Sequence, residues 1–139
     1  MKKLSKLSIV SICMVMVVTL FMGCSSKSVP MSLDSKWKQS NSNSEDSYQV
    51  ATIKDNIIEI YYESDNGKTQ SLYWVGTVIP PKTGEQPYVW DSVNDHEKTD
   101  KSLLGASGDT KTFTYENGVI SYKVGLMGTT TTVELEMVK

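Results

Sequence analysis

From Tyr48 to Val138, apolar and polar residues alternate with a period of two, and short clusters of Asp, Asn, Gly or Pro interrupt the alternation. Successive side chains of a β-strand point to opposite faces, so this pattern predicts strands and not helices. A shorter stretch around Trp37 predicts one more strand before them. The strands expected after Trp37 cover residues 48–54, 57–64, 70–79, 88–93, 102–106, 112–116, 119–127 and 130–138.

The residues between these segments predict tight hairpins. Asp55-Asn56, Asp65-Asn66-Gly67 and Asn117-Gly118 each follow one alternating segment and precede the next. Asn and Gly tolerate the positive φ angles that short hairpin turns require. Pro80-Pro81 ends one segment, because proline cannot donate a hydrogen bond to a sheet. Consecutive strands are therefore expected to pair antiparallel.

The alternation also assigns faces to the strands. Ile58, Ile60 and Tyr62 are expected on one face of their strand. In residues 70–79, strict alternation sets Leu72, Trp74 and Val78 against Tyr73, Val75 and Ile79. The apolar face of residues 119–127 is expected to consist of Ile120, Tyr122, Val124 and Leu126.

These elements indicate the fold class. Seven or eight strands at about ten-residue spacing, with no helical period after residue 24, indicate an all-β antiparallel meander. Closure into a small barrel removes the exposed edges of such a sheet, and a two-sheet sandwich is the alternative. Consecutive hairpins dominate, and only residues 80–87 and 94–101 are long enough to cross between two sheets, which favours the barrel. The predicted barrel domain spans residues 37–139.

The start of the chain has a different pattern. Lys2, Lys3 and Lys6 precede an apolar run of 16 residues, Leu7 to Met22. A membrane-spanning helix needs about 20 apolar residues, whereas a basic start and a shorter run are typical of a secretory signal peptide. We expect a signal peptide helix in residues 1–23. An uncleaved anchor and a signal cut without lipidation are the alternatives.

A cysteine stands directly after this run. The tetrapeptide Phe21-Met22-Gly23-Cys24 resembles the lipobox of bacterial lipoproteins. The resemblance implies that Cys24 becomes the first residue of the mature protein and carries a covalent diacylglycerol, with fatty acids such as palmitate. It also implies a location on the extracytoplasmic face of the cell membrane, held there by the lipid. Residues 24–36 are polar and contain Pro30, which predicts a flexible tether.

Composition narrows the range of partners. The chain has 14 lysines, no arginine and 16 acidic residues, and without residues 1–23 its net charge falls from −2 to −5. Recognition of a phosphate backbone needs a positive surface and usually arginine, so nucleic acid is excluded as a partner. Cys13 lies in the leader and Cys24 would be a thioether, so the domain has neither a free thiol nor a disulfide.

Candidate catalytic and metal-binding groups are sparse. His96 is the only histidine, and no nucleophile elbow, zinc-protease, Walker or dinucleotide motif occurs. Asp91, Asp95, Glu97 and Asp100 place four carboxylates within ten residues and could supply oxygen ligands to calcium. A solvated acidic loop is the simpler interpretation. We therefore expect no enzyme activity, no metal and no cofactor beyond the covalent lipid.

Aromatic residues provide the remaining candidate site. Trp74, Tyr73, Tyr88 and Trp90 lie on either side of the proline-bounded loop, and such rings are favoured where a surface is apolar on one side and wet on the other. They are expected to contact a ligand or partner. The alternative is that they belong to the core. A barrel of eight strands is just wide enough to be filled by side chains or to hold one small ligand.

The segment Asp34-Ser35-Lys36-Trp37 resembles the opening of lipocalin-like barrels, in which a tryptophan closes one end. With the lipobox and the meander, it makes the chain similar to small lipoproteins of Gram-positive bacteria and their prophages. The resemblance implies a non-enzymatic, lipid-anchored surface module that binds a protein or a small apolar ligand. A structural or regulatory envelope lipoprotein, including a prophage protein that interferes with superinfection, is the second hypothesis. A hydrolase is the third.

Overall fold

The computed structural model describes residues 31–139, so the predicted signal peptide, Cys24 and most of the tether lie outside the described residues. The described chain forms eight strands and one single-turn helix, α2 (His96–Thr99). The strands are β1 (Ser35–Gln39), β2 (Tyr48–Lys54), β3 (Ile57–Ser64), β4 (Thr69–Thr77), β5 (Tyr88–Val93), β6 (Thr110–Glu116), β7 (Val119–Leu126) and β8 (Thr129–Met137).

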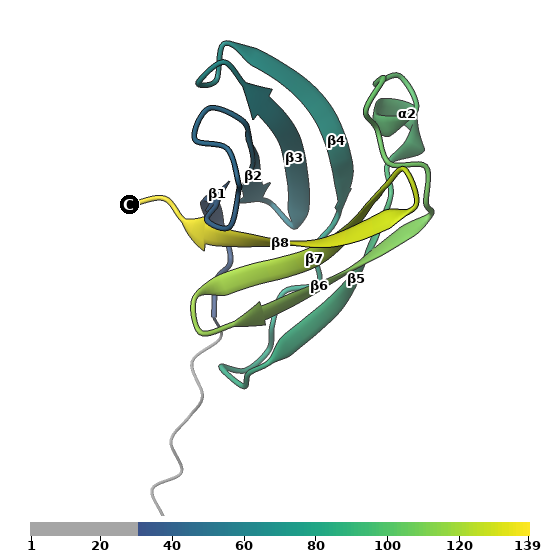
Figure 1. Cartoon of the computed structure of the whole chain (residues 1–139). Helices are drawn as coiled ribbons and strands as arrows, with labels where there is room; N and C mark the ends of the chain where they lie inside the picture. The colour runs from purple at the N-terminus through teal and green to yellow at the C-terminus, as the bar shows by residue number, and fades with distance from the viewer. Residues whose placement is uncertain (1–30) are drawn as a thin grey trace, which may run out of the picture.

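All eight strands belong to one antiparallel sheet in the order β4-β3-β2-β1-β8-β7-β6-β5. Consecutive strands are neighbours from β1 to β4 and from β5 to β8, and the pairing of β1 with β8 joins these two halves. The sheet curls until its edge strands, β4 and β5, meet at one point, which leaves a nearly closed barrel (Figure 1). The predicted all-β antiparallel barrel is confirmed.

Most strands lie where the alternation predicts them. β2, β3 and β5 have the predicted bounds, and β1 begins at Ser35, within the segment predicted as tether. The hairpin turns use the expected positive φ angles, for example 63° at Asn56 and 51° at Asn117. Local turn chemistry and alternation therefore determine the hairpins.

The barrel closes along a short seam between β4 and β5. A single bridge pairs Gly76 with Asn94, and the Asp95 N–H donates to the Val75 carbonyl at 2.8 Å. The backbones approach so closely that a Cβ on Gly76 would lie 2.3 Å from the Ser92 Oγ and 2.6 Å from a carbonyl oxygen of β5. A side chain at position 76 would therefore push the edge strands apart.

Beside the seam, irregular chain covers the rest of the β4 edge. Residues 102–106, predicted as a strand, contain turns and no strand, so that prediction was wrong. The Ser102 hydroxyl donates to the Leu72 carbonyl at 2.6 Å, and the Ala106 N–H donates to the Tyr73 carbonyl at 2.8 Å. The two leucines of this segment lie in solvent and not in the core, so hydrogen bonds and the packing of Ala106 hold it against the sheet.

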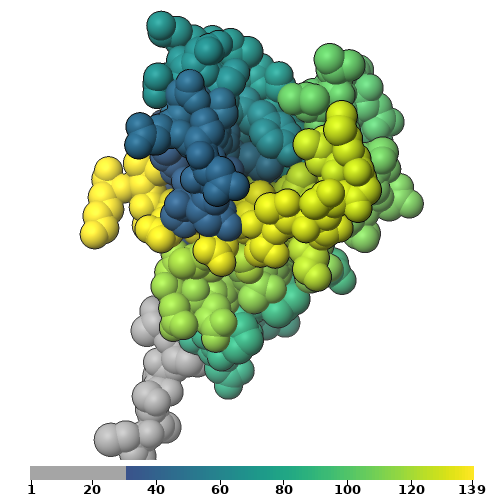
Figure 2. Space-filling model, in the orientation of Figure 1, coloured from purple at the N-terminus to yellow at the C-terminus, as the bar shows by residue number. Residues whose placement is uncertain are grey.

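The centre of the barrel is filled by side chains. Trp37, Trp74 and Phe113 are at most 1% exposed and belong to one hydrophobic cluster. The Trp37 indole N–H donates to the Leu33 carbonyl at 3.2 Å, which fixes this ring at the end of the barrel where the described chain begins. In Figure 2 the N-terminal segment (dark blue) lies against the C-terminal strand (yellow), in agreement with the pairing of β1 with β8.

A β-bulge in β4 corrects the predicted assignment of its faces. Ile60 pairs with Trp74, but the next residue, Tyr61, pairs with Leu72, so Tyr73 is an extra residue on β4. Tyr73 and Trp74 consequently both belong to the buried cluster, at 7% and 0% exposure. Strict alternation put them on opposite faces, and it fails here because a bulge shifts the register by one residue.

Candidate functional site

One end of the barrel is open. Residues 40–47, the β3–β4 hairpin, the β7–β8 hairpin and the chain after α2 surround it. A cavity of about 420 Å³, which we call the mouth, lies between them. Its principal lining residues are Gln49, Tyr62, Leu104, Val124, Leu126 and Val133.

The floor of the mouth is polar, and its groups bond to one another. Gln49 is only 2% exposed, and its side-chain carbonyl accepts a hydrogen bond from the Tyr122 hydroxyl. The Gln49 N–H donates to the side-chain carbonyl of Gln39 at 2.9 Å. Burial raises the pKa of the Tyr62 hydroxyl, and a hydrogen bond with Gln49 partly offsets this effect. The floor is therefore uncharged at neutral pH.

A set of stacked tyrosines supports this floor. The rings of Tyr62 and Tyr73 meet edge to face with centroids 5.3 Å apart, and those of Tyr73 and Tyr122 stack at 6.5 Å. Burial is also the main cause that raises the pKa of the Tyr73 and Tyr122 hydroxyls. Because these rings lie in the barrel interior, they prevent a ligand in the mouth from reaching the centre.

The rim of the mouth is apolar and exposed. Leu104 and Leu126 line the cavity and are 45% and 65% exposed. Their chain neighbours Leu103 and Met127 are 99% and 98% exposed. We call these four side chains the apolar rim. They are large apolar groups left in water at the tips of two separate loops, and two of them, Leu104 and Leu126, line the mouth itself.

Met127 occupies a turn position that other hairpins of this barrel give to a polar residue. Its φ angle is 49°, close to the 51° of Asn117 at the β6–β7 turn and the 52° of Asp55 at the β2–β3 turn. Asn and Asp tolerate this left-handed conformation, whereas a longer side chain without local hydrogen bonds costs about 1 kcal/mol there. Neither turn geometry nor packing explains a methionine at this position, because its side chain contacts almost nothing.

The described chain begins at the opposite end of the barrel from the mouth. Met31, Leu33 and Asp34 line a smaller cavity together with Asn56 of the β2–β3 turn and Val78 beyond β4. The mouth is built from the other ends of these strands, at Tyr62 of β3 for example. A tether at this position would therefore leave the mouth facing away from the attachment point.

The predicted aromatic site residues have different environments. Trp74 and Trp90 are buried, at 0% and 2% exposure, and Tyr88 is half-buried with its hydroxyl donating to the Ile79 carbonyl. Tyr73 is buried beneath the mouth, against Tyr62. The structure thus does not gather the four into one surface, and their binding role stays a prediction. The mouth residues lacked a sequence signal, because they come from six strands and two connecting segments.

The predicted acidic cluster is also dispersed. Asp91 accepts a hydrogen bond from the Thr112 hydroxyl at 2.6 Å, Asp95 lies 3.6 Å from the Lys98 ammonium, and Asp100 contacts His96. Glu97 is exposed. Within residues 31–139, no group of three or more His, Cys, Asp or Glu side chains is arranged to hold a metal ion.

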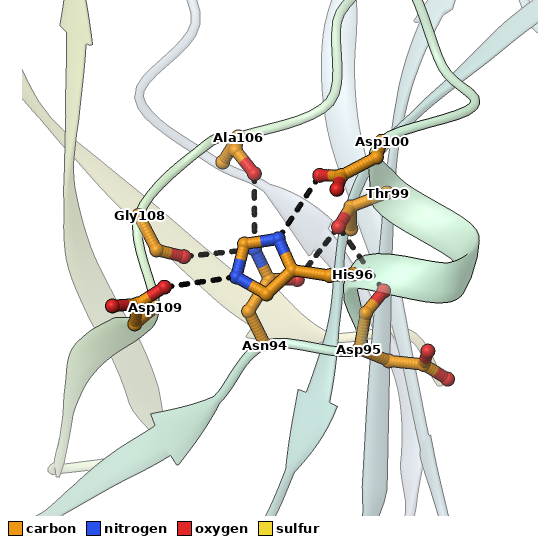
Figure 3. Close-up of polar contacts among 8 residues, drawn as sticks. All are labelled: Asn94, Asp95, His96, Thr99, Asp100, Ala106, Gly108 and Asp109. Atoms are coloured by element: carbon orange, nitrogen blue, oxygen red, sulfur yellow. Dashed lines mark hydrogen bonds and ion pairs between the residues drawn. The ribbon is translucent and has the colours of Figure 1, made fainter.

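His96 instead connects α2 to the start of β6. Its Nδ1 lies 2.9 Å from an Asp100 carboxylate oxygen and its Nε2 3.0 Å from an Asp109 carboxylate oxygen (Figure 3). Hydrogen bonds with the two aspartates, first Asp100 and then Asp109, raise the pKa of this imidazole. Sequence reasoning included Asp100 but not Asp109, which becomes a neighbour only when the loop folds back.

The buried side-chain amide of Asn94 binds the chain between α2 and β6. Its side-chain N–H groups donate to the Ala106 and Gly108 carbonyls at 3.0 and 2.8 Å, and its carbonyl accepts from the Thr99 hydroxyl at 2.8 Å (Figure 3). Asn94 also forms the single bridge that closes the barrel. The Asn94 side chain thus has hydrogen-bond partners for both its N–H groups and its carbonyl. These bonds connect α2 to the seam, which is a structural role.

The fold and the mouth define a class: a nearly closed, eight-stranded antiparallel barrel with a packed centre and one open end with an apolar rim. The chain gives no match to a protein-family model, to a curated protein or to a solved structure. In residues 31–139, no helix has the length and apolar character needed to cross a bilayer.

Proposed function

We propose that this protein is a lipid-anchored, extracytoplasmic binding module without catalytic activity, and that its mouth takes an apolar group from a protein or a small ligand. Lipid on Cys24 holds the protein at the outer face of the cell membrane. The barrel serves as a rigid support for the mouth. The lipobox-like leader supports the location, and the apolar rim supports the binding role.

The apolar rim carries this proposal. Burial of a large aliphatic side chain contributes about 1.5–3 kcal/mol, so the four exposed rim residues can contribute substantially to binding. The strained turn at Met127 adds to the argument, because asparagine would serve the turn better. Contact with a partner outside the domain would give a methionine there a physical reason.

The packed centre restricts where binding takes place. Trp37, Ile60 and Trp74 occupy the space in which a hollow barrel would hold its ligand. The mouth, at about 420 Å³, has the size of a small-molecule site but is open to solvent. This combination favours recognition at the end of the barrel over transport of a fully enclosed ligand.

The position of the tether agrees with the proposed location. The described chain begins beside Asn56 and Val78, at the end of the barrel opposite the mouth. An anchored barrel would then present the apolar rim to molecules outside the cell.

A neutral phenylnaphthylamine dye, whose fluorescence rises in apolar surroundings, tests the mouth. We expect the full-length protein in neutral detergent-free vesicles to bind this dye in excess of the amount that the same vesicles take up without protein. Leu126→Ser should weaken binding about tenfold, because it removes roughly 1.5 kcal/mol of apolar burial. Val89→Ser is the matched control, since Val89 is 53% exposed on β5, away from the mouth. Equal effects of the two substitutions would contradict the proposal.

A structural or regulatory envelope lipoprotein is the second candidate, including a prophage protein that interferes with superinfection. The packed centre favours it, because such a role requires only an outer surface. The same dye experiment separates the two: absence of binding by the unmodified protein would support this second role.

A further inference from the structure

The barrel wall has an opening between β6 and β7. These strands pair at only four positions, from Phe113–Tyr122 to Glu116–Val119, whereas β7 pairs with β8 at eight positions. β6 is paired with β5 from Thr110 to Tyr115. Its first residues, before Phe113, therefore follow β5 and are separated from β7. A cavity of about 540 Å³ lies at this opening, which we call the wall gap.

Lys111 occupies the wall gap from the inner side. Its ammonium donates to the Lys123 carbonyl at 3.1 Å. It also lies 5.1, 5.3 and 5.9 Å from the ring centroids of Tyr73, Trp74 and Tyr122. Aromatic faces attract a cation, but each such contact contributes only about 0.5–2 kcal/mol.

This ammonium has no acidic neighbour in the described part of the chain. The ion pairs within 4.0 Å there involve His96 and Lys98, and none involves Lys111. Partial burial of a cation is unfavourable without an opposite charge, and burial lowers the pKa of Lys111 accordingly. An ammonium has three N–H donors, and the Lys123 carbonyl accepts only one of them.

Hydroxyl-bearing residues line the outer side of the same gap, since on each strand they alternate with a buried, inward-facing residue. Thr114, Ser121 and Thr132 line the wall gap beside Lys111. The Thr112 hydroxyl also lies there but already donates to Asp91 at 2.6 Å. Carboxylate and phosphate oxygens accept hydrogen bonds from hydroxyl and ammonium groups. Hydrogen bonds with charged partners are about twice as strong as neutral ones.

We propose that the wall gap binds the anionic group of a small molecule, a carboxylate or a phosphate, with Lys111 as its counter-ion. The hydroxyls of Thr114, Ser121 and Thr132 orient the oxyanion. This site lies in the side of the barrel, and it depends neither on the lipid anchor nor on the binding role of the mouth.

Titration of the Lys111 ammonium tests the proposal directly. The full-length protein, labelled with ¹³C and ¹⁵N at lysine, is titrated with sodium acetate or sodium phosphate, with chloride keeping the ionic strength constant. We expect the Lys111 resonance, assigned from its absence in Lys111→Arg, to shift to saturation with at least one anion. Acetate alone would indicate a carboxylate ligand, and phosphate alone a phosphate. No saturable shift up to about 10 mM would overturn the proposal.

Variants separate this site from general charge attraction. Tryptophan fluorescence reports binding in each variant, because one of the three tryptophans, Trp74, lies beside Lys111. Lys111→Met should weaken the anion about tenfold or more, whereas Lys111→Arg should retain binding. Lys123→Met is the matched control, because Lys123 is an exposed lysine at the same gap. An equal loss in Lys111→Met and Lys123→Met would overturn the proposal. If Lys111→Met does not fold, the resonance titration of the unmodified protein decides.

Discussion

Trp74 and Trp90 are both buried, but only one of their indole N–H groups is paired. Trp74 donates to the Ser92 hydroxyl at 3.0 Å, across the seam that closes the barrel. The Trp90 N–H has no hydrogen-bond partner within the described residues. Its ring instead lies parallel to those of Tyr88 and Phe113, with centroids 5.7 and 5.1 Å away. Stacking and burial therefore stabilise Trp90, whereas Trp74 adds a hydrogen bond between the edge strands.

This difference predicts unequal effects of one substitution. Trp74→Phe and Trp90→Phe remove similar volumes, but Trp74→Phe also leaves the buried Ser92 hydroxyl without its partner. We expect Trp74→Phe to lower the free energy of unfolding by about 1 kcal/mol more than Trp90→Phe. Urea unfolding followed by circular dichroism measures both. A larger loss in Trp90→Phe would show that the seam hydrogen bond contributes little.

The β7–β8 hairpin combines poor turn chemistry with an exposed apolar tip. Its turn residue Met127 has the same left-handed backbone as Asn117 in the β6–β7 hairpin. The two turns are therefore a matched pair in which only the side chain differs. One turn is optimised for the fold, and the other presents an apolar group to its surroundings.

Exchanging these residues tests that interpretation. Met127→Asn should raise the free energy of unfolding by about 0.5–1 kcal/mol, because asparagine tolerates the positive φ angle. The same substitution should weaken binding of the neutral dye at the mouth. Asn117→Met is the control, and we expect it to lower stability by a similar amount without changing dye binding. Thermal unfolding and fluorescence titration measure the two effects.

Helix α2 is connected to β6 through a pair of contacts that depends on pH. Hydrogen bonds with Asp100 and Asp109 raise the pKa of His96 above its ordinary value of 6.5. The protonated imidazole is thus favoured in the folded state. Its stabilising contribution is fully present below pH 6.5 and is lost as the pH rises through the raised pKa of the folded state.

We therefore expect the stability difference between the unmodified protein and His96→Gln to be larger below pH 6.5 than at alkaline pH. The midpoint of urea unfolding, measured for both proteins from about pH 5 upward, gives this difference as a function of pH. A difference independent of pH would mean that His96 contributes through its shape alone. His96→Gln should leave dye binding at the mouth unchanged.

The described chain begins at one end of the barrel, and the mouth lies at the other end. The proposed lipid site precedes the described residues, and the barrel begins with Leu33 and Trp37 at the end opposite the mouth. This arrangement follows from the strand directions. Successive antiparallel strands run in opposite directions, which places the start of β1 at one end and the β3–β4 and β7–β8 hairpins at the other. Lipid attachment at Cys24 would use that arrangement to orient the mouth.

Substitution of each cysteine tests the proposed anchor. We expect the unmodified protein to incorporate a labelled fatty acid and to sediment with membranes. Cys24→Ala should lose the label, since no other thiol remains after residues 1–23 are removed. Cys13→Ala is the matched control and should retain the label, because Cys13 lies within the leader. Labelling that persists in Cys24→Ala would contradict lipidation at this residue.

The hairpins could be predicted because their causes are local. Asn56 and Asn117 adopt the positive φ angles that their turns need. Between such turns, alternation with a period of two predicts a strand. The prediction failed at Tyr73, where a bulge turns two successive side chains inward, and in residues 102–106, which no partner strand organises. Both failures depend on neighbours far away in the chain.

The candidate site was less predictable than the fold. Aromatic residues near the proline-bounded loop were reasonable candidates, yet Trp74 and Trp90 are packed in the core. The mouth combines Gln49, Val124 and Leu104, which have no pattern in common. The wall gap depends on where β6 leaves β7, and nothing near Lys111 in the sequence indicates that separation.

The amino-acid order alone therefore predicts most of the strands and their turns, because these depend on neighbouring residues. It also shows the lipobox-like leader and the absence of cysteine after residue 24. The closure of the barrel, the packed centre, the mouth and the wall gap with its half-buried Lys111 follow only from the folded arrangement. The physical reason is that these features arise from contacts between strands distant in sequence. Which side chains remain in water is known only after those contacts have buried the others.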